Sequence, residues 1–331
     1  MNLGSPSTSS SAAFVLLSLT MALATSGCDF QRTVDLKPPA HDSKPVLNSE
    51  IIPGQPWRVD LSRSVGAFQL GRPSDSTFTV TDATVMVSKE GERQGQLRLD
   101  SLNQYSTRQF TPEPGRQYTV RVSAPDLDTV RATDRVPRMP PMRLTAEDIG
   151  TVEGYYDRVL RLTIDDPPNT DNYYNVEVQK KGYGYSAISE DSTSIDTLGL
   201  TDVRFRTRSR PIINEMQQVL EEANAYQGRD ATFKDVVFNG TKHTIRFQVG
   251  EGEFFFSDRD AGDGYPRLKY FLYVSTLSED AYQFDHTQRI LARTEGNPFA
   301  EPVDVHSNVE GGYGIVAGRH TDTLRVEVSL E

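Results

Sequence analysis

The chain has 331 residues, a formal net charge of −11 and a single cysteine, Cys28. This length is sufficient for two domains of ordinary size. A strongly acidic chain without a basic patch argues against a nucleic-acid partner, because binding to phosphates needs clustered Lys and Arg. One cysteine excludes a disulfide within the chain, and an acylated Cys28 would also exclude a cysteine nucleophile and a thiolate metal site.

The N-terminal segment predicts export and lipidation. A short apolar run extends from about Ala12 to Ala24, and it is too short to span a bilayer but suits the core of a secretory signal peptide. The sequence Thr-Ser-Gly-Cys at 25–28 resembles a lipobox, although Thr25 stands where Leu is commonest and the first eleven residues carry no Lys or Arg. We predict a signal peptide over residues 1–27 and lipidation of Cys28, which would anchor the chain stably through several acyl groups. The alternative is an ordinary secretory signal with an incidental cysteine.

Two β-rich domains are predicted after the anchor. Residues 28–44 are polar and contain prolines, and we interpret them as an extended tether. Residues 45–138 contain short runs of alternating polarity separated by Pro-Gly turn signals, which predicts an immunoglobulin-like or transthyretin-like β-sandwich of about 90 residues. The proline-rich segment 136–142 is the expected boundary. The alternating apolar residues of two of these runs are Trp57, Val59 and Leu61, and Tyr118, Val120 and Val122.

Residues 142–331 predict a second β-rich domain with one or two helices. Helical spacing from Pro211 predicts a helix that stops at Gly228, and Ser278 is the expected N-cap of a second helix. Asn239-Gly240 predicts a β-hairpin with a type I′ turn. The sequence ends on alternating residues typical of a strand. Further strands are indicated by Leu160, Leu162 and Ile164, and by Tyr174, Val176 and Val178.

A glycine-rich segment at 311–318 has the residue spacing of a nucleotide-binding motif. Gly312-Tyr-Gly-Ile-Val-Ala317 fits G-x-G-x-x-A, but the strand-like sequence TDTLRVEVSLE follows it and no helix does. A dinucleotide fingerprint needs a helix N-terminus to hold the pyrophosphate and an acidic residue about 20 positions further on. We therefore expect no nucleotide site here. A fold role would require at least one of Gly312 and Gly314 to adopt a positive φ.

The C-terminal segment combines an Asn-Pro-Phe-x-Glu-Pro turn at 297–302, Ser-Asn at 307–308, Gly-Gly-Tyr-Gly at 311–314 and a final strand. In this combination it resembles a bacterial lipoprotein family catalogued as domain of unknown function 4249 (DUF4249). Weaker similarity extends upstream over nearly all of the mature chain. His306 departs from the family, which often has an aromatic residue there.

This resemblance implies a lipid-anchored protein of the Gram-negative outer membrane whose gene often lies near TonB-dependent receptors. It implies an accessory or binding role beside such a receptor and names no ligand. We interpret the glycine-rich motif as structural, with a partner surface as the alternative.

Residues that could carry chemistry are scattered. The five histidines form no metal-binding helix motif, although His306 and His320 flank the glycine segment with Asp304 and Asp322 nearby. A Ser within GYSAI misses the G-x-S-x-G pattern of hydrolases. An acidic loop departs from the calcium-binding pattern, so we predict no metal site and keep its three aspartates as weak candidates: Asp258, Asp260 and Asp263.

Aromatic residues beside glycines are the candidate contacts for a ligand or partner, because exposed aromatic rings on loops suit recognition. Our prediction is a non-catalytic, lipid-anchored accessory protein of the outer membrane, without cofactor, nucleotide or nucleic acid. The alternatives are a periplasmic or surface hydrolase acting on glycans or peptides, and a purely structural envelope lipoprotein. The candidate contacts are Tyr183, Tyr185 and Tyr313.

Overall fold

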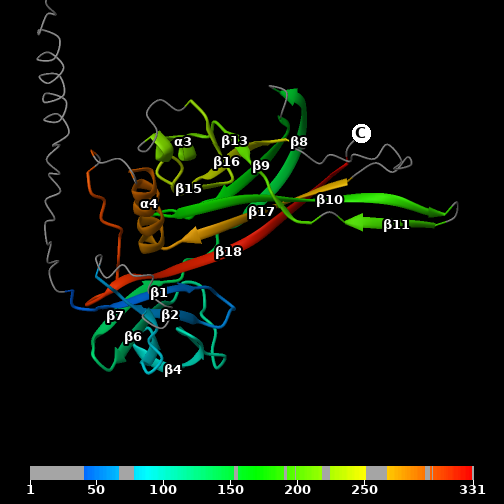
Figure 1. Cartoon of the computed structure of the whole chain (residues 1–331). Coiled ribbons are helices and arrows are strands. Elements are labelled where there is room, and N and C mark those ends of the chain that lie inside the picture. The colour runs from blue at the N-terminus through cyan, green and yellow to red at the C-terminus, as the bar shows by residue number, and fades with distance from the viewer. Residues whose placement is uncertain are drawn as a thin grey trace, which may run out of the picture. The chain divides into compact units, whose positions relative to one another are not determined.

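The computed structural model describes residues 41–66, 78–152, 156–189, 192–197, 199–217, 224–250, 267–294, 299 and 301–329. Residues 41–331 cluster as one compact unit. The predicted signal peptide, Cys28 and the acidic-loop aspartates Asp258, Asp260 and Asp263 lie outside the described residues. The described chain is mainly β-structure with two sheets and two helices, which confirms the predicted fold class (Figure 1).

The N-terminal part is a β-sandwich built on alternating residues. The first half of β4 pairs with β3 and its second half pairs with β5, so one strand passes between the two layers. The predicted alternation of Trp57, Val59 and Leu61 is confirmed, because all three side chains are buried in the core of this sandwich. Its strands are β1 (Pro45–Ile51), β2 (Arg58–Arg63), β3 (Thr84–Lys89), β4 (Glu92–Ser101), β5 (Gln104–Ser106), β6 (Gln117–Ala124) and β7 (Leu127–Arg135).

The C-terminal part packs two sheets face to face. One contains β10, β15, β17 and β18, and the other has the order β14-β13-β16-β9-β8. Apolar side chains from both sheets form one buried cluster, as the alternation around Leu162 and Val176 predicted. The elements are β8 (Met142–Val152), β9 (Tyr156–Asp165), β10 (Tyr173–Ser189), β11 (Ser192–Thr197), β12 (Thr201–Asp202), β13 (Phe205–Thr207), α3 (Arg210–Gln217), β14 (Tyr226–Gly228), β15 (Asp230–Lys234), β16 (Lys242–Val249), β17 (Arg267–Leu277), α4 (Glu279–Thr294) and β18 (Tyr313–Ser329).

The long sheet continues from the C-terminal part into the sandwich. β18 pairs antiparallel with β17 over Arg319–Ser329 and parallel with β1 through its first residues (Figure 1). Val309 and Val316 are buried in the core of the sandwich, whereas Leu324 packs against the second core. The final strand therefore contributes to both cores, and the proposed domain division at 138–142 stays a prediction.

Two local predictions are wrong. The helix beginning near Pro211 does not extend to Gly228, because residues 226–228 form β14, where Tyr226 pairs with Thr207 and its ring packs against Phe205. Tertiary pairing outweighs helical spacing at this point.

The Asn239-Gly240 segment is a turn but not a type I′ hairpin. Gly240 has φ +72°, whereas a type I′ turn also needs a positive φ at Asn239, and Asn239 has none. The flanking strands do not pair with each other. β15 joins β10 and β16 joins β9, so the turn connects two sheets.

Candidate functional site

The glycine segment begins β18 and lies directly against β1. Leu47 pairs with Gly314, whose φ is +101°. A Cβ at Gly314 would lie 2.1 Å from the carbonyl oxygen of Leu47, and one at Gly312 would lie 2.5 Å from that of Pro45. The prediction that one of these glycines needs a positive φ is confirmed at Gly314. Because glycine has no Cβ, both positions also permit the close approach of β1 and β18. A strand rather than a helix follows the glycines, so the segment lacks the helix N-terminus that would hold a pyrophosphate.

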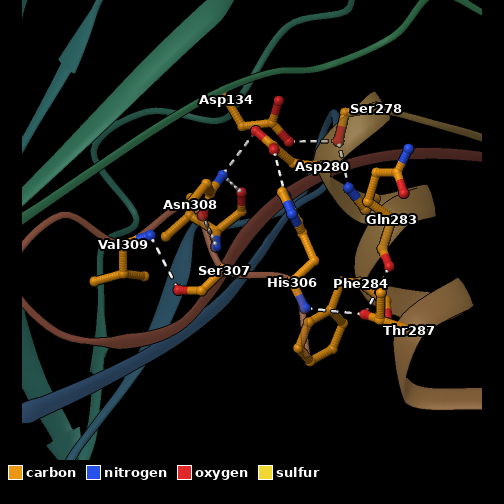
Figure 2. A network of polar contacts seen from close by, with 12 residues as sticks. Asp134, Ser278, Asp280, Gln283, Phe284, Thr287, His306, Ser307, Asn308 and Val309 are labelled. Atoms are coloured by element: carbon orange, nitrogen blue, oxygen red, sulfur yellow. Dashed lines mark hydrogen bonds and ion pairs between the residues drawn. The ribbon is translucent and has the colours of Figure 1, made fainter. Parts of the chain in front are cut away.

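Asn308 acts as a substitute strand partner for β18. Its Nδ2 donates to the carbonyl oxygen of Val316 at 2.8 Å, and its Oδ1 accepts from the Val316 amide at 3.0 Å. Nδ2 also lies 3.0 Å from Oδ2 of Asp280 on α4 (Figure 2). The side chain therefore fixes the strand and the helix to each other at one point.

His306 belongs to the same network. Its Nε2 lies 2.7 Å from Oδ1 of Asp280, and its amide donates to Oγ1 of Thr287 at 2.9 Å (Figure 2). Asp280 thus forms hydrogen bonds with both residues, with His306 through Oδ1 and with Asn308 through Oδ2. The segment before β18 is therefore held along one side of α4.

Asp134 of β7 links the sandwich to this network. Its Oδ2 accepts hydrogen bonds from the Ser278 hydroxyl and, at 2.6 Å, from the Gly318 amide, while its Oδ1 accepts from the Arg135 amide. Ser278 in turn accepts from the Ala281 amide at 3.1 Å, which confirms Ser278 as the N-cap of α4. Burial raises the pKa of Asp134 to about 6, although its hydrogen bonds from Ser278, Gly318 and Arg135 act in the opposite direction.

Sequence reasoning missed Asp134 and Asp280. Asp134 alternates with buried Ala132 and Val136, so it stands at a core position of β7. A charged residue on the apolar side of an alternating strand is a signal for a buried polar contact, because carboxylates are seldom buried without partners. Two of its partners, Ser278 and Gly318, lie more than a hundred residues away, and only the fold identifies them.

A family model described as Domain of unknown function (DUF4249) matches residues 31–325. The chain belongs to the DUF4249 family. The match begins three residues after Cys28 and includes every residue of the Asp134–Asn308 network. No curated protein matches this DUF4249 chain.

The predicted contact tyrosines of this DUF4249 chain lie on two strands. Tyr313 begins β18 with 47% of its surface exposed, and the Lys44 ammonium lies 5.5 Å from its ring centroid. Tyr183 lies on β10 beside two lysines that pair with each other in the β10–β17 ladder, and their ammonium groups are 5.5 Å (Lys181) and 5.2 Å (Lys269) from its ring centroid. Tyr185 is on the same strand, two residues further on, opposite Ile195 of β11. Tyr183 and Tyr185 therefore lie in a strand rather than in the expected loop.

The histidines of the DUF4249 chain are dispersed. His306 contacts Asp280, whereas His320 pairs with Thr276 in the β17–β18 ladder. Within the described ranges, no group of three or more His, Cys, Asp or Glu side chains is placed to hold a metal ion. The others bind Ser64 (His41), stack on Phe238 (His243) or lie 3.4 Å from Glu215 (His286).

A polar groove of about 310 Å³ lies between α4 and the sheet. Asp285 and Arg289 line it from α4, and Glu177 and Arg319 line it from the sheet. Arg289 is ion-paired with Asp230, and an Arg319 nitrogen lies 3.5 Å from Asp285. Burial raises the pKa of Asp285, and the two arginines oppose that shift. The groove thus combines both signs of charge on rigid elements.

No described helix has both the length and the apolar character that a membrane crossing requires.

Proposed function

We propose that this DUF4249 chain is a lipid-anchored, non-catalytic accessory protein of the outer membrane that binds a protein partner, with a TonB-dependent receptor as that partner. The anchor is proposed from Cys28 and the short apolar run before it. The receptor is proposed from the family resemblance. Binding is supported by how the C-terminal motif divides into inward and outward residues.

The observation that carries the proposal is the exposure of two aromatic residues within that motif. Phe299 has 93% of its surface exposed and Tyr313 has 47%. In contrast, Asn308, Gly312 and Gly314 lie against other segments of the same chain. Exposed aromatic rings are candidates for a partner contact, because aromatic residues are enriched at interface centres. We interpret the inward residues as the support and the outward rings as the partner contact.

The hydrolase alternative is represented by the groove beside α4, where the pKa of Asp285 is raised by burial. General acid–base catalysis at a glycosidic bond uses two carboxyl groups that flank it. Here Asp230 is ion-paired with Arg289, and Asp285 lies near Arg319. Two of the three carboxylates that line the groove, Asp230 and Asp285, are thus matched by arginines, which favours a binding or structural role over proton transfer.

Cys28→Ser is expected to release the protein from the membrane fraction. The substitution removes the thiol that would carry the acyl groups, and no helix among the described residues is long and apolar enough to cross a membrane. Fractionation of cells expressing wild type and Cys28→Ser, with metabolic labelling by a fatty acid, measures this. A variant that stays membrane-bound, together with an unlabelled wild type, would contradict the anchor.

The double variant Phe299→Ser/Tyr313→Ser is expected to retain its melting temperature and to lose partner binding by about 30-fold or more, as for a contact worth roughly 2 kcal/mol or more. The measurement is co-purification from native membranes, followed by titration of the partner recovered with wild type. Leu102→Ser is the matched control, because Leu102 is 71% exposed in the sandwich. Equal recovery of partner by all three proteins would favour a purely structural role.

A further inference from the structure

Three arginines from three strands converge on the outer face of the sandwich. Arg93 lies in β4, Arg121 in β6 and Arg131 in β7. The register places Arg121 directly opposite Arg131 and Met86 on the other side of Arg121. Together with Met86, Ser88 and Thr119 they line a cavity of about 320 Å³, which we call the arginine pocket.

The positive charge of the arginine pocket is not neutralised by the described chain. None of its three guanidinium groups lies within 4.0 Å of a described carboxylate, whereas Arg319 pairs with Glu50 and Arg161 with Glu147. Like charges directly opposite on a sheet face are unfavourable. Such an arrangement in a chain of net charge −11 indicates an anionic ligand.

The chemistry of the lining favours a phosphate group. Guanidinium groups bind oxyanions through paired N–H donors, and three of them suit a tetrahedral anion with three terminal oxygens better than a carboxylate with two. The Ser88 hydroxyl lies on the same face and can donate a further hydrogen bond, while the neighbouring Thr119 hydroxyl shares a hydrogen bond of 2.8 Å with Thr133. Met86 contributes apolar surface, and Nη2 of Arg93 lies 3.8 Å from its sulfur.

We propose that the arginine pocket binds a terminal phosphate group, either of a soluble molecule or of a lipid headgroup. The proposal is independent of the aromatic contact surface, since the two surfaces use different residues in different parts of the chain. A failure of partner co-purification would therefore not contradict phosphate binding by the arginine pocket.

The test uses full-length protein purified in a neutral detergent, with inorganic pyrophosphate as the soluble probe. Pyrophosphate is expected to raise the melting temperature of wild type, because a ligand that binds only the folded state stabilises it. Arg121→Gln and, separately, Arg93→Gln are expected to weaken binding about tenfold or more, as for a lost charge-assisted hydrogen bond. Arg98→Gln, which removes an exposed arginine of β4 outside the pocket, should bind as wild type does.

A second arm replaces pyrophosphate with phosphatidic acid in the micelle, against phosphatidylcholine. A stabilisation by phosphatidic acid that Arg121→Gln abolishes identifies a headgroup, and one by pyrophosphate alone identifies a soluble ligand. Without ligand, Arg121→Gln is expected to melt no lower than wild type, because it removes the unfavourable Arg121–Arg131 pair. The proposal is overturned if neither probe stabilises wild type, if acetate at equal ionic strength does so equally, or if Arg98→Gln loses as much as Arg121→Gln.

Discussion

Gly314→Ala is expected to destabilise the fold more than any other alanine substitution in the glycine segment. Its φ of +101° disfavours any residue with a Cβ, and that Cβ would lie 2.1 Å from the Leu47 carbonyl oxygen. Strain of about 1–2 kcal/mol and overpacking of about 1–3 kcal/mol add to roughly 2–5 kcal/mol. The measurement is the free energy of unfolding from denaturant titration.

Two other glycines separate the causes. Gly91 has φ +86° with nothing within 4 Å of its Cβ position, so Gly91→Ala reports strain alone. Gly318 has no positive φ, but a Cβ there would lie 2.2 Å from the Arg135 carbonyl oxygen, so Gly318→Ala reports overpacking alone. A Gly314→Ala variant as stable as Gly91→Ala would show that β1 and β18 do not approach this closely.

Wild type is expected to gain stability relative to Asp134→Asn as the pH falls from about 6 to about 4. The pKa of Asp134 is raised to about 6 by burial, whereas that of an unfolded Asp is near 3.8. Between these values the folded state binds a proton that the unfolded state does not, so this carboxyl destabilises the fold above pH 6 and ceases to do so near pH 4. The full change is roughly 3 kcal/mol at this pKa difference.

The measurement is the difference in unfolding free energy between wild type and Asp134→Asn across this range. Asp285 also has a raised pKa, but it is present in both proteins and its contribution cancels. A pH-independent difference would mean that Asp134 titrates normally and that the junction with Ser278 is open to water.

The sequence predicted features that depend on local patterning. Alternation located the strands around Trp57, Leu162 and Val176, and the hydroxyl of Ser278 before an amphipathic run marked the start of α4. The end of α3 was not predictable from spacing, because Tyr226 keeps helical spacing yet pairs with Thr207 in a strand. Asn239-Gly240 marks a turn, but a turn signal does not say which strands the flanking segments join.

The candidate site was predicted less completely than the fold. The glycines, Tyr313 and Ser-Asn at 307–308 were found because they are close together in sequence. The partnership of Asp134 with Ser278 and the meeting of Arg93, Arg121 and Arg131 depend on strand register between distant segments. Residue spacing in a single sequence does not predict the register between distant strands. For this reason the sequence was interpreted as having no basic patch, although the fold brings these three arginines together.

The parallel pairing of β1 with β18 has a consequence for biogenesis. The strands of the sandwich come first in the chain. Its core is completed only by the late residues Val309 and Val316, and β18 pairs with the edge of β1. Contacts between such distant segments form slowly, because the intervening chain must be ordered before they can be made. As the chain is synthesised, residues 45–138 therefore keep an open apolar edge until the last strand is available to pair with β1. A chaperone that covers such apolar surfaces would protect the nascent sandwich from aggregation during that interval.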